Sequence, residues 1–500
     1  MREFMASTAL LPHQQAAVDK VLPVRVSGLF MDMGTGKTRT TIELARLRAA
    51  KIDHVIWFCP VSLKETVRRE ILKHTDCTAA EICVFDSKTS SANVPRNAMW
   101  YIVGVESLSS STRVVLAASA VITERSFVVM DESSYIKGHL ATRTKRATVL
   151  AEKARYRSIL TGTPLSQGIV DLFSQMYFLS PKILGYRSFL SFEANHLEYH
   201  PQHPGLVVRS HNVPYLVEKI KPYVYQCTKD ECLSIPHKIF KTVWCALSDG
   251  QEAAYSEAKG RFFHDLEDLQ NRYFDIKKND LPESFFVRAS LLMFRLFSQL
   301  QTIVCGFQNI RDESGAAVMH EYENERISLL LDIVAGIPEK DKIIIWAKYQ
   351  HSIAEIAAAL AEKYGVDAVA EFHGKLSSEQ RDEKLNLFQN GARFLIATQS
   401  AGGHGLNLQF CHWQIFYANG FKYSERLQAE DRCHRHGQTR KVTYIDIFAS
   451  DTIDEKIQNS LEKKGNLLAS FRQEVNRIKD DKKITYKDKY EKLKDMVKGW

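Results

Sequence analysis

The chain has 500 residues, enough for about two to four domains that each bury their own core. A hydrophobic fraction of 45% and a charged fraction of 25% are ordinary for a water-soluble globular protein. No apolar run approaches the ~18 residues that span a bilayer, and the first residues lack the apolar region of a signal peptide. We therefore expect a soluble cytoplasmic protein, in the host cytoplasm if the gene is carried by a phage, with no membrane partner.

The net charge of +8 is mildly basic, which is compatible with a polyanionic partner without requiring one. The nine cysteines include no C-x-x-C pair, so the sequence does not predict a structural zinc site. Scattered thiols of this kind fit a reducing compartment.

A phosphate-binding loop is the first chemical feature along the chain. Residues 24–31 form a short apolar run typical of a buried strand, and an apolar-periodic helix is expected from Thr38 to Ala50. Between them stand the residues Gly34, Thr35, Gly36, Lys37 and Thr38. Glycines let backbone N–H groups turn toward an anion, the new helix adds its positive dipole end, Lys37 adds a charge, and Thr38 offers a hydroxyl to Mg²⁺.

Short apolar runs alternate with helical patterns up to about residue 180, and the same rhythm returns after about residue 340. This alternation predicts an α/β fold with two parallel sheets, each flanked by helices. The second sheet has no glycine–lysine loop, which suggests that a nucleotide is held between the two lobes. Residues 250–307 have the pattern of long helices without strand signals and are expected to be a helical insertion. Residues 471–500 are lysine-rich, and we expect a solvated, frayed helix there, with a grip on nucleic acid as the alternative.

The run from Phe127 to Met130 is an apolar strand that ends in Asp131 and Glu132. Acids at the carboxyl edge of a parallel sheet face the bound ligand. We expect Asp131 to hold Mg²⁺ and Glu132 to orient and deprotonate the attacking water, which is the division of work that phosphoryl transfer requires.

In the second lobe, Arg432 and Arg435 are three residues apart, a spacing that places both on one face of a helix. Two guanidiniums on one face can stabilise negative charge on a γ-phosphate, as arginine fingers do.

These segments together resemble the superfamily 2 helicases and, within them, the Swi/Snf-type DNA translocases of compact phage or bacterial kind. The resemblance covers roughly residues 9–465. The matching segments, in chain order, are residues 11–14, 34–38 (motif I), 59–63 (Ia), 105–107 (Ib), 131–134 (II), 160–165 (III), 235–238, 342–350 (IV), 373–374 with Arg381, 401–408 (V) and 428–438 (VI). The family often has Ala-His where this chain has Ser133 and Ser134, so a histidine link between motifs II and III is not expected.

The resemblance implies two RecA-like lobes with a helical insertion between the core motifs. Residues 1–228 would form lobe 1, 229–340 the linker and insertion, 341–470 lobe 2, and 471–500 a basic tail. It also implies ATP and Mg²⁺ as cofactors, an adenine contact from Gln14 and a nucleotide contact from Gln428. The residues that would contact nucleic acid are Ser62, Lys64, Ser107, Lys348, His373, Gly374 and Thr398.

The resemblance implies an ATPase stimulated by nucleic acid that moves along duplex or branched DNA with little sequence preference. We expect it to remodel forks or junctions in replication, recombination or repair, with other replication or recombination proteins as partners. The alternatives are a motor that displaces proteins from DNA within a larger assembly, an RNA helicase, and a non-catalytic ATP-gated scaffold. The scaffold is disfavoured by the intact set of site residues, Lys37, Asp131, Glu132, Arg432 and Arg435.

Overall fold

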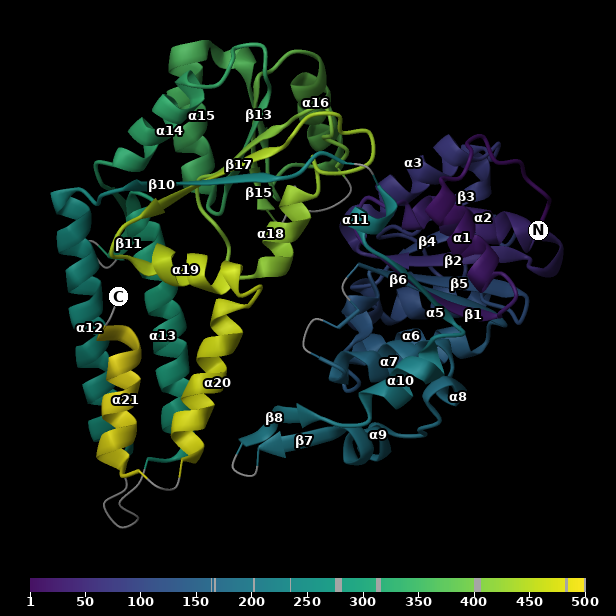
Figure 1. Cartoon of the computed structure of the whole chain (residues 1–500), viewed down its shortest axis with the longest axis horizontal. Helices are drawn as coiled ribbons and strands as arrows, with labels where there is room; N and C mark the ends of the chain where they lie inside the picture. The colour runs from purple at the N-terminus through teal and green to yellow at the C-terminus, as the bar shows by residue number, and fades with distance from the viewer. Residues whose placement is uncertain are drawn as a thin grey trace. The chain divides into compact units, whose positions relative to one another are not determined.

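The computed structural model describes residues 1–500 except 163, 166–167, 201–202, 234, 275–280, 312–315, 400–405, 482–483 and 499–500. The chain divides into two compact units. Unit 1 comprises Met1–Tyr199 and Val207–Ile235, and unit 2 comprises His200–Leu206 and Pro236–Trp500. Figure 1 shows the elements of both units in chain order.

A seven-stranded parallel sheet forms the centre of unit 1, with the strand order β3-β4-β2-β5-β6-β1-β9. The strands are β1 Val26–Met31, β2 His54–Cys59, β3 Ile82–Val84, β4 Trp100–Gly104, β5 Ser126–Asp131, β6 Tyr156–Thr161 and β9 Val224–Cys227. The helices are α1 Pro12–Val21, α2 Lys37–Leu47, α3 Lys64–His74, α4 Ser107–Ser110, α5 Thr112–Val121, α6 Thr142–Glu152, α7 Val170–Leu179, α8 Pro181–Leu184, α9 Phe189–His196, α10 Val213–Ile220 and α11 Lys229–Cys232, and β7 Leu197–His200 pairs with β8 His203–Ser210.

The strands of unit 1 bury both faces, because successive side chains point to opposite sides of a sheet. On β5, Val128 and Met130 belong to the apolar cluster under α5, α6 and α7, whereas Phe127 and Val129 belong to the cluster under α1, α2 and α3. This double burial explains why the strands are continuous apolar runs in the sequence.

Unit 2 contains a six-stranded parallel sheet with the order β10-β17-β16-β13-β15-β14. Its strands are β10 Ile239–Cys245, β13 Ile343–Ala347, β14 Val369–Phe372, β15 Phe394–Thr398, β16 Trp413–Phe416 and β17 Thr443–Ala449. Its helices are α12 Asp249–Tyr273, α13 Glu283–Val304, α14 Glu325–Ala335, α15 Gln350–Tyr364, α16 Ser378–Asn390, α18 Tyr423–Glu430, α19 Ile453–Glu462, α20 Leu467–Asp480 and α21 Tyr486–Lys498, and β11 Phe307–Arg311 pairs antiparallel with β12 Ala317–Glu321. The predicted fold class, two helix-flanked parallel sheets with a helical insertion, is confirmed.

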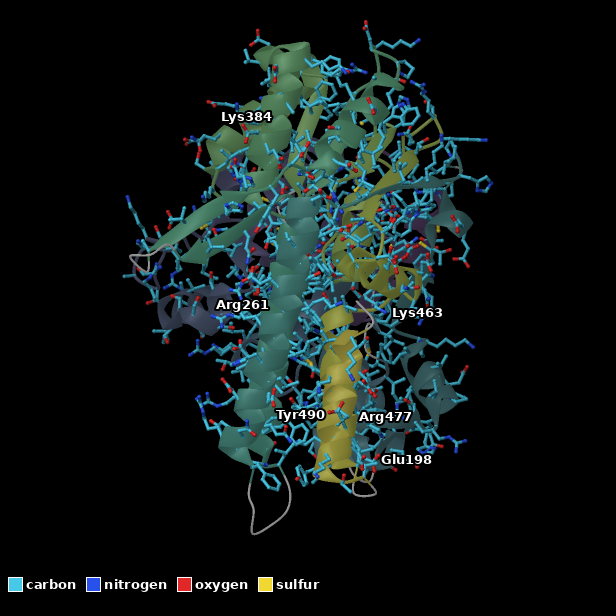
Figure 2. The ribbon with its side chains drawn as sticks, turned by 90° about the vertical axis from the view of Figure 1, so that its left-hand side faces the viewer. Glu198, Arg261, Lys384, Lys463, Arg477 and Tyr490 are labelled. Carbon is cyan, nitrogen blue, oxygen red and sulfur yellow. The ribbon has the colours of Figure 1, made fainter. Side chains whose placement is uncertain are left out.

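Four helices of unit 2 form a bundle: α12 and α13 from the insertion, and α20 and α21 from the end of the chain. Figure 1 shows them side by side, and Figure 2 shows α12 beside the C-terminal helices, with Arg261 labelled on α12 and Tyr490 on α21. The expectation of a solvated, frayed tail is wrong. Val475 and Ile478 of α20 and Leu493 and Val497 of α21 are buried in one apolar cluster with residues of α12 and α13. Helix α20 packs on α13, and α21 packs on α20 and α12, because an apolar helix stripe requires a partner.

In the part of the chain that the structure describes, no helix combines the length and the hydropathy needed to cross a membrane. The nine cysteines, all of them described, are free thiols.

Candidate functional site

The glycine loop of unit 1 follows the carboxyl end of β1 and ends where α2 begins at Lys37. Gly34 and Gly36 have φ angles of 81° and 87°, in the left-handed region that side chains other than glycine rarely adopt. A Cβ atom on Gly36 would also lie 2.0 Å from Nε2 of Gln14. The loop therefore needs glycine at this position both for its backbone conformation and for the close approach of α1.

Two side chains of α1 hold the loop in place. Nε2 of Gln14 donates a 3.1 Å hydrogen bond to the carbonyl oxygen of Thr35, and Oε1 accepts one of 3.0 Å from the backbone of Leu11. Nε2 of His13 lies 2.7 Å from the same carbonyl oxygen of Thr35. Sequence reasoning missed His13, although it stands beside Gln14, because a histidine in a helix carries no signal of its own.

The ammonium group of Lys37 points back to the strand end. It donates hydrogen bonds to the carbonyl oxygens of Met31 (2.8 Å) and Asp32 (3.3 Å). The motif III glycine, Gly162, packs against the same backbone, since a Cβ there would lie 3.4 Å from the oxygen of Met31. Motifs I and III are thus in direct contact at the carboxyl ends of the neighbouring strands β1 and β6.

Asp131 ends β5, and its carboxylate is almost completely buried. Burial, together with the neighbouring charge of Glu132, raises the pKa of Asp131 to about 6, against the lowering effects of Lys37 and of the Trp57 indole, which donates a 3.3 Å hydrogen bond. Glu132 itself has a φ angle of 51°, a left-handed conformation that costs a residue with a side chain about 1–3 kcal/mol. Such local strain is concentrated at active sites.

The residues present fit a magnesium ion. Mg²⁺ prefers oxygen ligands, and a carboxylate that is buried and raised in pKa is one that a nearby cation would stabilise. Asp131 supplies that carboxylate, and Thr38 places a hydroxyl in the first turn of α2. The described residues contain no cluster of three or more His, Cys, Asp or Glu that could hold a metal by themselves.

One buried amide joins motif II to motif III. Oγ of Ser133 donates a 2.5 Å hydrogen bond to Oε1 of Gln175 on α7, and Nε2 of Gln175 donates to the carbonyl oxygens of Pro164 (2.8 Å) and Asp171 (2.9 Å). Gln175 is fully buried. A serine–glutamine pair therefore lies where the sequence departs from the family pattern. A polar residue within the apolar run of α7 was the signal that could have revealed it.

The three candidate nucleic-acid contacts of unit 1 lie at the carboxyl ends of two adjacent strands, β2 and β4. Ser62 and Lys64 follow β2, and Ser107 follows β4. The backbone N–H of Val61 donates a 2.9 Å hydrogen bond to Glu106, which ties motif Ia to motif Ib. The ammonium of Lys64 donates to the carbonyl oxygen of Phe85, so in this structure it is a bridge within the unit.

The motif VI arginines of unit 2 do not share a helical face, so that expectation is wrong. Helix α18 ends at Glu430, whose carbonyl oxygen accepts hydrogen bonds from the side chains of Gln414 and Tyr444, each 3.1 Å long. Arg432 and Arg435 lie in the turns that follow. Nε of Arg432 donates to the backbone oxygen of Gln428 (3.2 Å), and Nη1 of Arg435 donates to that of Leu406 (3.1 Å).

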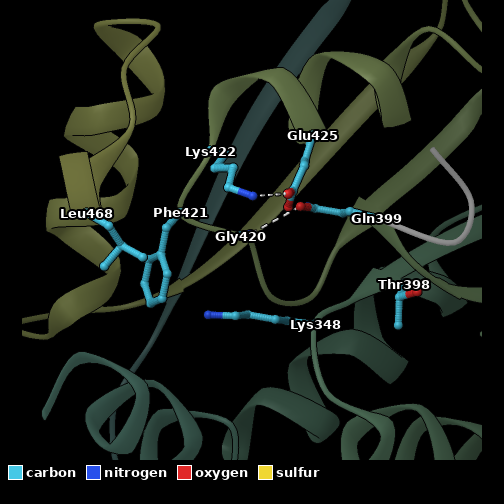
Figure 3. A pocket seen from close by; sticks show the side chains of 8 residues that line it. All are labelled: Lys348, Thr398, Gln399, Gly420, Phe421, Lys422, Glu425 and Leu468. Carbon is cyan, nitrogen blue, oxygen red and sulfur yellow. Dashed lines mark hydrogen bonds and ion pairs between the residues drawn. The ribbon is translucent and has the colours of Figure 1, made fainter. Parts of the chain in front are cut away.

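A cavity of about 230 Å³ opens at the carboxyl edge of the sheet in unit 2 (Figure 3). It is lined by Lys348, Thr398, Gln399, Gly420, Phe421, Lys422, Glu425 and Leu468. Two of the sequence-predicted nucleic-acid contacts, Lys348 and Thr398, are therefore brought together, since they follow or end the adjacent strands β13 and β15. Sequence reasoning missed Gln399 and Phe421, because neither belongs to a segment that predicts a binding site.

The ammonium of Lys348 lies 3.5 Å from the centre of the Phe421 ring, and burial lowers the pKa of this lysine to about 8. Gln399 holds the loop that follows β16, because its Oε1 accepts a 3.1 Å hydrogen bond from the backbone N–H of Gly420. Lys422 is paired with Glu425 at 2.8 Å, as the dashed line in Figure 3 marks.

His373 and Gly374 follow β14, the strand next to β15, and do not line the cavity. A Cβ on Gly374 would meet no atom within 4 Å, so the glycine is not required by packing inside the unit. Residues 401–405 of motif V lie outside the described residues, as does Thr163 of motif III.

Comparisons with known proteins agree with this arrangement of motifs. The SNF2-related domain matches residues 15–305, and the helicase conserved C-terminal domain matches residues 325–437. An uncharacterized ATP-dependent helicase of Mycoplasma pneumoniae is 26% identical over 491 residues, which cover 94% of this chain and 43% of that protein. The DNA annealing helicase and endonuclease ZRANB3 of Mus musculus is 25% identical over 519 residues, covering 98% of this chain and 44% of that protein.

The chain thus spans less than half the length of these two relatives. Among solved structures, the SWI2/SNF2 ATPase core of Sulfolobus solfataricus in complex with dsDNA is similar at 22% identity and a TM-score of 0.41, covering 100% of this chain and 99% of that one. The helicase class predicted from the motifs is confirmed by the two domain matches. Since the SNF2-related domain alone accounts for more than half of its residues, the chain belongs to the SNF2-related family of helicases.

Proposed function

We propose that this chain hydrolyses ATP, couples the turnover to movement along DNA, and remodels branched DNA such as forks and four-way junctions. The observation that supports the proposal most directly is the cavity of unit 2, where Lys348 and Thr398 converge at the carboxyl edge of the sheet. Ligands of open α/β sheets bind at that edge.

The nucleotide chemistry is assigned to residues around the glycine loop of unit 1 and to two arginines of unit 2. Backbone N–H groups of the loop and the first turn of α2 bind the phosphates, and Lys37 exchanges its carbonyl partners for phosphate oxygens. Thr38 and Asp131 would hold Mg²⁺, which neutralises charge on the phosphates. Glu132 accepts the proton of the attacking water, while Arg432 and Arg435 stabilise the charge on the transferred phosphoryl group.

The DNA contacts are assigned to the residues at the strand ends. Ser62 and Ser107 offer hydroxyls, Gly374 offers a backbone N–H, and Lys348 offers an ammonium in a partly buried setting. Contacts of this kind recognise phosphates and carry no base information, so we expect little sequence preference and a strong dependence on salt.

A branched substrate is the finer part of the proposal. The name of the mouse relative, a DNA annealing helicase, supports a substrate that includes separated strands. Roles in replication, recombination or repair, alongside other proteins of those processes, follow from the same substrate.

The test is the rate of ATP hydrolysis with single-stranded DNA, duplex DNA, forked DNA, four-way junctions or RNA of equal length, at fixed salt. The Glu132→Gln variant serves as the inactive control. We expect strong stimulation by DNA, strongest with forks or junctions, and weak stimulation by RNA. Equal stimulation by plain duplex and by branched DNA would refute the proposed preference for branched DNA and favour a motor that displaces bound proteins. No stimulation by any nucleic acid would refute the proposal.

A further inference from the structure

A buried glutamine makes the first of two connections between the helical bundle of unit 2 and the cavity. Gln301 stands in the last turn of α13 and is fully buried. Its Oε1 accepts hydrogen bonds from the ammonium of Lys348 and from the hydroxyl of Tyr349 (3.1 Å), and its Nε2 donates one of 2.8 Å to the backbone oxygen of Asn419. One amide therefore fixes the chain after β13 and the chain after β16, which form two sides of the cavity.

The start of α20 makes a second connection between the bundle and the cavity. The backbone N–H of Leu467 donates a 3.0 Å hydrogen bond to the oxygen of Phe421, and that of Tyr423 donates one of 3.1 Å to Gly465. The ring of Phe421 packs against the apolar core of the bundle, and Leu468 lines the cavity. Figure 3 shows Leu468 next to Phe421, with Lys348 extended toward the ring.

The partners of Lys348 are unusual because they hold the ammonium without cancelling its charge. An amide oxygen and the face of an aromatic ring are neutral groups that attract a cation. Among the described residues, no carboxylate lies within ion-pair distance of Lys348, and Glu425 at the rim is paired with Lys422. The positive charge thus stays available for an anion that enters the cavity.

We propose that Gln301 is a positioning residue of the nucleic-acid site, which orients the ammonium of Lys348 toward the place of a DNA phosphate. Through Gln301, the helical bundle contributes to the affinity for DNA. The inference rests on the proposed function of the cavity. Its physical basis is preorganisation. A free lysine side chain samples many rotamers, and ordering it on binding weakens affinity, whereas a side chain that is already anchored avoids this loss.

The experiment measures the affinity of the full chain for a fluorescent DNA duplex at fixed salt. Gln301→Leu keeps the size of the side chain and removes both hydrogen-bonding groups, and we expect affinity to fall about tenfold. Gln299→Leu, on the same helix and only partly buried, is the matched control and should leave affinity unchanged. In a Lys348→Met background, Gln301→Leu should weaken binding further by less than about twofold, because its effect acts through the lysine.

A pH profile separates positioning from a purely structural role. The pKa of Lys348 is about 8, and the groups around it that titrate or carry charge are Cys305, Glu425, Asp454, Lys422 and Tyr349. Wild-type affinity should fall as the pH rises through about 8, and Lys348→Met should flatten this fall. Gln301→Glu, which retains the length of the side chain, should move the fall to higher pH, because a carboxylate stabilises the adjacent ammonium.

The Lys348→Met and Gln301→Leu variants separate the proposed function of the cavity from the positioning role of Gln301. If Lys348→Met leaves DNA affinity unchanged, the cavity is not a DNA site and the proposed function of this edge is refuted. If Lys348→Met weakens binding but Gln301→Leu does not, or if Gln301→Leu has its full effect without the lysine, only the positioning role is refuted. Should Gln301→Leu fail to fold, an unshifted pH profile in Gln301→Glu would refute the positioning role by itself.

Discussion

The glycine loop of unit 1 and the cavity around Lys348 in unit 2 each lie at the carboxyl edge of a parallel sheet. The two are built in opposite ways. The loop comes from one continuous stretch, and its main groups are backbone N–H, a lysine and a threonine within residues 34–38. The cavity takes its lining from the ends of several strands, from a loop after β16 and from the start of α20. A site of contiguous residues depends on local conformation, whereas an assembled site depends on long-range packing.

The largest expected effect concerns the contiguous site. Lys37→Ala removes the ammonium group that the proposed function assigns to the phosphates, and we expect ATP turnover to fall below detection while the protein stays folded. The measurement is ATP hydrolysis with saturating DNA, together with circular dichroism. Lys51→Ala, an exposed lysine of the same unit, should retain full turnover. Near wild-type turnover in Lys37→Ala would show that the loop is not the catalytic site.

A second prediction concerns Arg435 of unit 2, to which the proposed function assigns the charge on the transferred phosphoryl group. Arg435→Ala should leave ATP binding largely intact and lower hydrolysis by about 10³-fold or more, which is typical of the loss of an arginine finger. Binding of a fluorescent ATP analogue and turnover are measured on the same sample. Lys441→Ala, an exposed neighbour, is the control. An unchanged hydrolysis rate would remove Arg435 from the active site.

The helical bundle also depends on long-range packing, because its helices come from two distant parts of the chain, residues 249–304 and 467–498. Leu493 of α21 is fully buried, so Leu493→Ala should lower the free energy of unfolding by about 2–5 kcal/mol. Val287 of α13 is 55% exposed, and Val287→Ala should change it by less than about 1 kcal/mol. Urea unfolding compares the two, and equal effects would mean that α21 does not pack on the bundle.

The buried carboxylate of Asp131 predicts a dependence of stability on pH. Its pKa rises from 3.8 to about 6 on folding, so the native state binds more protons than the unfolded state between these values. The free energy of unfolding should therefore decrease as the pH rises through this window, by up to about 3 kcal/mol.

The side chain of Asp131→Asn cannot ionise, so the free energy of unfolding of this variant should not show this decrease. In buffer without Mg²⁺, the variant should gain more stability over the wild type at pH 7.5 than at pH 5. Thermal unfolding at the two pH values checks the sign, and a gain that is equal at both would contradict the raised pKa.

The smallest effect is expected at the link between motifs II and III. Gln175→Leu removes the hydrogen bonds to Ser133 and Pro164. We expect DNA-stimulated turnover to fall about tenfold, because a tenfold change in rate corresponds to the free energy of about one buried hydrogen bond. Ser133→Ala should have a similar effect, and the double variant should be little worse than either one. Fully additive losses would show that the two residues do not act as a pair.

The sequence predicted most of the sheet strands and the family, because parallel strands buried on both faces are continuous apolar runs. Strand β5 with Asp131 and strand β1 with the glycine loop are examples in which local pattern and chemistry coincide. The prediction for residues 471–500 was wrong, because the many lysines there concealed the apolar faces of two amphipathic helices, α20 and α21. Their partners α12 and α13 lie about 200 residues earlier in the chain. The sequence also placed Arg432 and Arg435 on one helix, whereas Gln414 and Tyr444 end that helix from neighbouring strands.

The sequence by itself determined the fold class, which is confirmed, and it predicted the glycine loop, the acids and the arginines as site residues, since each follows from residues close together in the chain. Only the tertiary structure decided what surrounds Lys348, what replaces the motif II histidine and what covers the insertion. Gln301, Gln175 and Leu493 are ordinary residues in sequence, and they gain their roles from burial beside a distant partner, which no local pattern encodes.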